Sequence, residues 1–256
     1  MLQFIILFLC IINTCFATEN FCSPIPTGGK SAIQAIKWYH DSAEKKAIYR
    51  QTYAMAAEYV NNEVKQQHLK QHTWGVILDI DETTSDNSWY YKKCNDDTSN
   101  EDNFEHRITI KEISVALPGV IDFIDKVHKL GGYVSMVTNR DGAYKDDTGN
   151  SLDSTINNLK KQHIHYDQVI LARHNTDKNP RFNAVEFGKY DANLMVWSNK
   201  LPPHKVIAYV GDNIQDFPEL KQDNIHNLDC NNPIFNKFGH GYFVLPNPIY
   251  GSWMNI

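Results

Sequence analysis

Cysteine is scarce in this 256-residue chain, which has five. Three of them follow the apolar start of the chain, namely Cys22, Cys94 and Cys230. Their separations fit no cysteine-based metal site, and an odd number leaves one thiol over. The cysteines therefore argue against a zinc site of their own and leave any disulfide pairing open.

Positive charge is also in short supply. Lys and Arg number 25 against 30 Asp and Glu, which gives a formal net charge of −5. Binding a nucleic acid polymer requires a basic surface that offsets the phosphate backbone, so this balance argues against such a partner. With 42% hydrophobic residues, the chain is long and apolar enough for one α/β domain.

The first residues have the pattern of a targeting segment. Residues 2–16 are almost entirely apolar, and Ala17 supplies a small residue at a cleavage point, so we expect residues 1–17 to be a signal peptide. The run is shorter than the roughly 18 to 20 apolar residues of a stable membrane span. The sequence therefore predicts an exported protein, periplasmic or secreted. Neither Cys15 nor Cys22 follows a good lipoprotein cleavage site, and a lipid anchor stays open.

Beyond a linker at 18–30, residues 31–256 are expected to form a single domain. It opens with an N-terminal helical extension at 31–70, either one long helix or two packed ones. Strand-like runs then alternate with helix-like segments, which predicts an α/β fold with a central, mostly parallel sheet flanked by helices. The expected strands are 76–81, 133–138, 168–172, 205–210 and 242–245, and the expected helices are 118–130, 151–163 and 181–190.

A polar insertion at 92–117 interrupts this alternation. Loops of that length are usually functional or disordered. The insertion is therefore expected to be either a small cap over the active crevice or a solvated surface loop.

The most informative motif is Asp79-Ile80-Asp81-Glu82-Thr83, which follows the apolar run Val76-Ile77-Leu78. Side chains two residues apart on a strand point to the same face, so two carboxylates are aimed at the crevice where parallel α/β sheets bind ligands. An EF-hand loop does not fit, because Thr84 stands at its glycine position and Tyr90 at its final glutamate position. Taken alone, such a motif is more often an ordinary acidic turn after a strand than a catalytic site.

Three further segments place polar side chains at predicted strand ends or loops. Thr138-Asn139-Arg140 ends the second strand, Asp212 and Asp216 follow the fourth, and Lys178 lies between them. Hydroxyl, carboxamide and ammonium groups suit the oxygens of a phosphoryl group. Together these segments favour a phosphate site over an acidic turn.

With these motifs the chain resembles the haloacid-dehalogenase (HAD) superfamily of phosphohydrolases, and within it the class C, or lipoprotein-type, bacterial acid phosphatases. The resemblance extends from about Ser31 to Trp253 and implies a Rossmann-like HAD fold and a phosphomonoesterase. It also includes the segments Trp38-Tyr39-His40-Asp41-Ser42-Ala43-Glu44, Asp86-Asn87-Ser88, Leu117-Pro118-Gly119, Phe238-Gly239, Leu245-Pro246-Asn247-Pro248 and Tyr250-Gly251-Ser252-Trp253.

The resemblance assigns the central chemistry to three aspartates. Asp79 would be the nucleophile that takes the phosphoryl group as an aspartyl phosphate. Asp81 would protonate the leaving alkoxide and then activate water. The carboxylates of Asp79 and Asp212, with the backbone carbonyl of Asp81, would hold Mg²⁺, which prefers oxygen ligands.

The remaining roles concern geometry and charge. Thr138 and Asn139 would bind phosphoryl oxygens, and Lys178 would neutralise charge on the nucleophile and the phosphate. Asp216 would orient Lys178 or the waters on the metal. Thr83 is expected to close the loop after the strand through a local hydrogen bond.

The aromatic residues bear on the substrate. Trp89, Tyr90 and Tyr250 could stack on a nucleobase or an aryl group, although packing is the commoner role of such residues. We therefore expect nucleoside or aryl monophosphates as substrates, and small phosphomonoesters rather than nucleic acid polymers as partners. His163 and His165 lack further zinc ligands nearby and are expected to be surface residues.

Two other functions stay open. The same aspartyl phosphate could be passed to an alcohol, which would make the protein a phosphotransferase. A non-catalytic binding or adhesion module on a HAD fold is the other alternative. The sequence does not decide whether the protein is a homo-oligomer.

Overall fold

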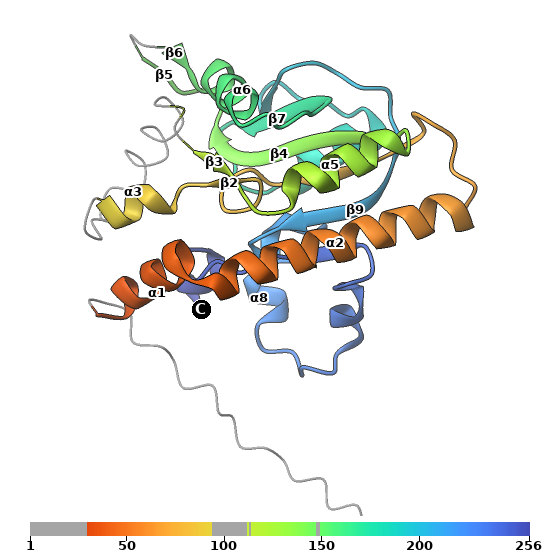
Figure 1. The fold of residues 1–256 in the computed structure, drawn as a ribbon. Coiled ribbons are helices and arrows are strands. Elements are labelled where there is room, and N and C mark those ends of the chain that lie inside the picture. The colour runs from red at the N-terminus through yellow and green to blue at the C-terminus, as the bar shows by residue number, and fades with distance from the viewer. Residues whose placement is uncertain (1–29, 94–111, 113, 147–148) are drawn as a thin grey trace, which may run out of the picture.

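The computed structural model describes residues 30–93, 112, 114–146 and 149–256 (Figure 1). The predicted signal peptide, almost all of the linker, most of the cap-like insertion, Cys22 and Cys94 lie outside the described residues. Cys230 lies within them, exposed and with a free thiol. In the part of the chain that is described, no helix combines the length and the apolar character needed to cross a membrane.

A six-stranded sheet forms the centre of the domain, in the order β10-β9-β1-β4-β7-β8 (Figure 1). All neighbouring pairs are parallel except β7 and β8, so the predicted α/β fold with a mostly parallel sheet is confirmed. The strands are β1 (Trp74–Leu78), β4 (Tyr133–Asp141), β7 (Gln168–Ala172), β8 (Met195–Trp197), β9 (Lys205–Gly211) and β10 (Tyr242–Val244).

Helices cover both faces of the sheet, and successive side chains of β1 pack against helices on opposite faces. Val76 and Leu78 pack in the core with the first set of helices, whereas Ile77 packs in the core on the other face. Every residue of β1 is buried, as expected of a parallel strand covered on both sides. The first set is α1 (Lys30–Asp41), α2 (Ala43–Gln66), α5 (Val120–Lys129) and α6 (Ser151–Lys161), and the second is α7 (Asn179–Phe187) and α8 (Gln222–Ile225).

The N-terminal extension consists of two helices, separated at Ser42. The Ser42 side chain accepts a hydrogen bond from the backbone N–H of Lys45 at 3.1 Å and so caps the start of α2. Shorter elements complete the described fold: β2 (Ser85–Asp86), α3 (Ser88–Lys93), β3 (Val115–Ala116), β5 (Lys145–Asp146), β6 (Gly149–Asn150), and the 3-10 helices η2 (Ile214–Asp216), η3 (Pro233–Lys237) and η4 (Ser252–Asn255).

The boundaries of several elements differ from the sequence prediction by a few residues, and for two of them the cause is clear. Strand β1 ends at Leu78 rather than 81, because the carbonyl of Ile80 accepts the N–H groups of Thr84 at 2.9 Å and Ser85 at 2.8 Å, which closes a turn. Helix α7 ends at Phe187 rather than 190, because Gly188 adopts a left-handed conformation with φ 68°. The antiparallel strand β8 was not predicted, since three residues carry too little pattern.

Candidate active site

The site lies at the carboxyl edge of the sheet, where β1 and its two neighbours end. Asp79 is the first residue after β1, and its N–H donates to the carbonyl of Val210 in β9 at 3.0 Å. On the other side of β1, strand β4 carries Thr138 and Asn139, and Asp212 directly follows β9. The parallel topology therefore brings the candidate residues of three strands to one edge.

Lys178 connects two of the carboxylates. Its Nζ lies 2.5 Å from Oδ1 of Asp79 and 2.6 Å from Oδ1 of Asp216, and its side chain is 3% exposed. Burial opposes the ammonium charge, but Asp216 and Asp79 outweigh it and the pKa of Lys178 is raised. Lys178 is therefore a charged group inside the site rather than a solvated surface lysine.

Three carboxylates form a cluster suited to a cation. One oxygen each from Asp79, Asp212 and Asp216 lies within 4.8 Å of the others. Burial, only partly offset by Lys178, raises the pKa of Asp79 to about 7. Burial and the neighbouring carboxylates raise the pKa of Asp212 well above its usual range. Such a dense group of oxygen ligands fits a hard divalent ion, which would stabilise the ionised forms.

Asp212 is fixed by two side chains. Thr83 donates from Oγ1 to Oδ1 of Asp212 at 2.7 Å, and Asn247 donates from Nδ2 to Oδ2 at 2.9 Å. Thr83 therefore reaches across to another strand end, whereas a local hydrogen bond was predicted. Asp216 can approach because Gly211 has no side chain: a Cβ there would lie 2.3 Å from that of Asp216.

The carboxylate of Asp81 lies apart from this cluster. Arg140 binds both of its oxygens, at 2.9 and 2.7 Å, and the Asn87 amide donates to Oδ1 at 2.7 Å. Burial works against ionisation, but Arg140 and Asn87 prevail, and the pKa of Asp81 is lowered. Sequence reasoning assigned no role to Arg140 or Asn87, although Arg140 directly follows the predicted phosphate-binding pair.

The two predicted phosphate-binding residues occupy the end of β4. Thr138 is buried, and its Oγ1 accepts from the N–H of Arg140 at 3.2 Å. The carboxamide oxygen of Asn139 accepts a hydrogen bond from Nη2 of Arg181. Burial lowers the pKa of Arg181 to about 10, which leaves it charged at neutral pH. Asn139 therefore connects the end of β4 to α7, next to Lys178.

The loop between Asp79 and Thr84 is held by the N-terminal helices. Tyr49 donates to the carbonyl of Glu82 at 2.5 Å, and Tyr53 donates to that of Thr83 at 2.7 Å. Both tyrosines are buried. Helix α2 therefore satisfies the backbone of the turn that follows the candidate nucleophile, a role that sequence reasoning did not predict.

Among the predicted aromatic residues, Tyr250 lies nearest to the motif after β1. Its hydroxyl donates to Glu82, and its ring packs against Tyr91 with a centroid distance of 5.7 Å. Burial raises the pKa of Glu82 well above its usual range. Trp89 is half-buried in α3, and the side chain of Tyr90 lies outside the described part. His163 and His165 are both exposed.

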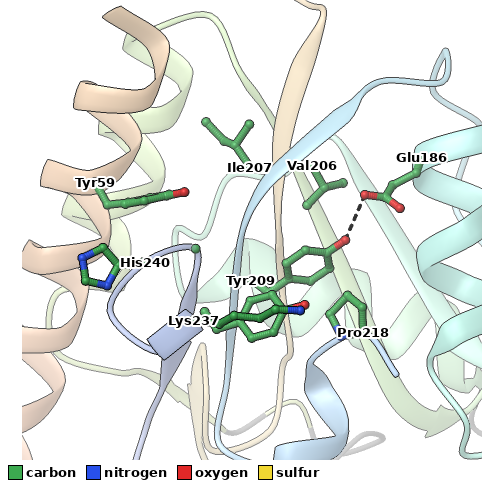
Figure 2. A pocket seen from close by; sticks show the side chains of 10 residues that line it. Tyr59, Glu186, Val206, Ile207, Tyr209, Pro218, Lys237 and His240 are labelled. Carbon is green, nitrogen blue, oxygen red and sulfur yellow. Dashed lines mark hydrogen bonds between the residues drawn. The ribbon is translucent and has the colours of Figure 1, made fainter. Parts of the chain in front are cut away.

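A cleft outside the candidate active site lies along β9. Figure 2 shows a cleft of about 420 Å³ between α2, α7 and strands β9 and β10. Two pairs of its side chains interact: Tyr209 donates to Glu186 at 3.0 Å, and Nζ of Lys237 lies 5.3 Å from the centroid of the Tyr242 ring. Its lining residues on β9, from Val206 to Tyr209, lie roughly 10 to 20 Å from Asp212 at about 3.3 Å per strand residue. This cleft is therefore separate from the candidate active site.

The fold and the site together define a hydrolase of the HAD type. A family profile, HAD superfamily, subfamily IIIB (acid phosphatase), matches residues 15–253. The chain therefore belongs to that family and is a phosphomonoesterase.

Two solved structures share the fold. They are the class C acid phosphatase from Bacillus anthracis and the same enzyme with tungstate bound. Each is 24% identical, covers 87% of this chain and 86% of its own, and superposes with a TM-score of 0.67. The family match confirms the resemblance to HAD acid phosphatases stated from the sequence, and the two structures confirm the fold.

Proposed function

We propose that this chain is an exported, magnesium-dependent acid phosphatase that hydrolyses nucleoside or aryl monophosphates through an aspartyl phosphate. The observation that carries the proposal is the position of Lys178, which bridges Asp79 and Asp216 beside Asp212. A buried cation at a carboxylate cluster provides charge stabilisation for a transferring phosphoryl group.

The residues divide the reaction into two displacements. Oδ of Asp79 attacks phosphorus, and the bond to the ester oxygen breaks. Asp81, which is ionised at rest because its pKa is lowered, takes up a proton from solvent and passes it to that oxygen. Water then attacks the aspartyl phosphate, Asp81 takes a proton from the water, and phosphate leaves with Asp79 regenerated. Thr138 and Asn139, at the end of β4, hold the phosphoryl oxygens during both steps.

Magnesium is the proposed cofactor because every candidate ligand is an oxygen. Asp79 and Asp212 would hold it, together with the backbone carbonyl of Asp81 and with Asp216 close enough to bind the ion or its waters. When bound, the ion neutralises charge between the acidic crevice and a dianionic phosphate. Chelation should therefore abolish turnover, and Mg²⁺ should restore it.

The aromatic side chains near the motif after β1 support the proposed substrate class. Tyr91 and Tyr250 pack together next to Glu82, and Trp89 lies in the adjacent helix α3. Flat aromatic surfaces bind nucleobases and aryl groups by stacking. Nucleoside and aryl monophosphates should therefore be hydrolysed faster than glycerol phosphate.

Export is proposed from the apolar segment at 2–16, which ends at the small residue Ala17. Terminal sequencing of protein recovered outside the producing cytoplasm should find a mature chain that begins at Thr18. A mature chain that retains residues 1–17 would refute this part of the proposal.

The decisive experiment measures phosphate release from a panel of nucleotides, sugar phosphates and aryl phosphates, with Mg²⁺, from acid to neutral pH. The matched control is Asp79→Asn, which keeps the size of the side chain but removes the nucleophile. Turnover that survives in Asp79→Asn, or wild-type protein that is inactive on every ester, would overturn the proposal.

A further inference from the structure

Asp81 is held by a set of donors different from that of Asp79. Arg140 donates from Nε to Oδ2 at 2.9 Å and from Nη2 to Oδ1 at 2.7 Å. Asn87 donates from Nδ2 to the same Oδ1 at 2.7 Å. These contacts use both acceptor positions of Oδ1 and one of the two on Oδ2. Among the residues that the structure describes, no further donor contacts Oδ2, which thus keeps an acceptor position through which a proton can pass.

Arg140 is itself fixed from behind. Its side chain is 1% exposed, and Nη1 donates to Oγ1 of Thr155 in α6 at 3.1 Å. The register between β4 and β7 shifts between Thr138 and Asp141, so Arg140 lies in an irregular part of the strand. Such irregularities change the direction in which the side chains of a strand point. The fold therefore directs this guanidinium at Asp81 from a rigid support.

We propose that Arg140 is a positioning residue for the phosphatase reaction: its guanidinium holds the Asp81 carboxylate in the orientation from which Oδ2 serves the leaving group. An aspartate side chain otherwise has several staggered rotamers, and in some of them the carboxylate would turn away from the ester oxygen. The inference rests on the proposed function, because it requires Asp81 to act on the leaving group.

Lys178 and Arg140, which contact the two aspartates of the motif, then have separate tasks. Lys178 contacts Asp79 and Asp216 as a point charge, whereas Arg140 uses a planar fork that matches both oxygens of Asp81. A lysine at position 140 would keep the charge but lose the paired contact. Arg140→Lys therefore tests orientation rather than charge.

The leaving group provides a readout that a purely structural role would not change. Proton donation matters most for a poor leaving group such as the alkoxide of AMP, and least for 4-nitrophenolate. Since a misplacement of about 1 Å can cost on the order of 100-fold, Arg140→Lys should lower kcat for AMP by that order. For 4-nitrophenyl phosphate, Arg140→Lys should lower kcat by a factor at least about tenfold smaller than the factor for AMP.

Arg50→Lys is the matched control, because Arg50 also pairs with an aspartate, Asp122 at 3.3 Å, but both side chains are exposed on the surface. It should keep near-wild-type kcat on both substrates. In Arg140→Ala, added guanidinium chloride at low concentration should restore part of the activity on AMP. Melting temperatures identify any variant that fails to fold. If Arg140→Lys fails to fold, the test is instead whether guanidinium restores activity on AMP to the folded fraction of Arg140→Ala.

A double-mutant cycle completes the experiment. If Arg140 acts through Asp81, then Arg140→Lys should cost nothing further in the Asp81→Asn background. Equal losses on both substrates, or additive losses in the double variant, would overturn the inference. Failure of the proposed function is recognised separately, since wild-type protein would then release no phosphate from either ester.

Discussion

Adding Mg²⁺ to the metal-free protein should raise its melting temperature, and more at neutral than at acid pH. The reason is the crowding of Asp79, Asp212 and Asp216, whose oxygens lie within 4.8 Å of one another. Lys178 pairs with only two of these carboxylates. A divalent ion would supply the missing positive charge in the folded state, and the unfolded chain has no such cluster.

The magnitude follows from linkage. At a concentration of about 100 times Kd, an ion stabilises the folded state by about 2.7 kcal/mol, which is roughly 5 to 10 °C for a domain of this size. The pKa of Asp79 is about 7 in the folded chain against an ordinary 3.8. Because this pKa is raised, the metal-free protein loses stability as pH rises from about 4 to 7, by roughly 4 kcal/mol at most.

Differential scanning fluorimetry at about pH 4.5 and 7.5, with Mg²⁺ or a chelator, checks this expectation. Asp212→Asn should reduce the shift caused by the metal and should raise the metal-free melting temperature at the higher pH. The matched control is Asp122→Asn, an exposed carboxylate on α5, which should behave as wild type. The reasoning fails if Asp212→Asn keeps the full shift, or if Mg²⁺ stabilises most at the lower pH.

Three further outcomes can be measured with single variants. Asp79→Asn should lose phosphate release entirely while its circular dichroism stays native, and an unfolded variant would contradict that. Lys45→Met should lower the free energy of unfolding in urea by about 3 to 5 kcal/mol, because it leaves the carboxylate of Asp86 without its partner. The side chain of Lys45 is 4% exposed, and that of Asp86, 2.6 Å away, is 17% exposed. A change under about 1 kcal/mol would show that the pair is hydrated. Tyr53→Phe should cost about 1 to 3 kcal/mol, because the buried carbonyl of Thr83 loses its 2.7 Å donor; unchanged unfolding would mean that water replaces the hydroxyl.

The sheet could be predicted because its strands are continuous apolar runs, and the site because its motifs follow those runs. Parallel topology then brings Asp79, Thr138 and Asp212 together without any detailed knowledge of side chains. Lys178 lies outside a strand, and from the residues alone it was an ordinary loop lysine. Its burial depends on packing between distant segments, which local pattern does not reveal.

The contacts that orient the site were beyond sequence reasoning for the same reason. Arg140 and Thr155 meet across two elements, and nothing in their spacing distinguishes this pair from two surface residues. Thr83 donates to Asp212, 129 positions away, instead of closing its own loop. Side-chain hydrogen bonds of this kind depend on exact interatomic distances, whereas sequence periodicity specifies only which face of an element is buried.

Tyr49 has a consequence for how the enzyme is made. Its hydroxyl donates to the carbonyl of Glu82 and also lies 3.2 Å from that of Pro246, 197 positions later in the chain. One buried hydroxyl thus joins the first helices, the catalytic turn and the final segment. Contacts of such high sequence separation form late in folding. During synthesis α2 is made long before Pro246, and this three-way contact can form only after that later segment has been made, so a chain interrupted before Pro246 should have no partial activity.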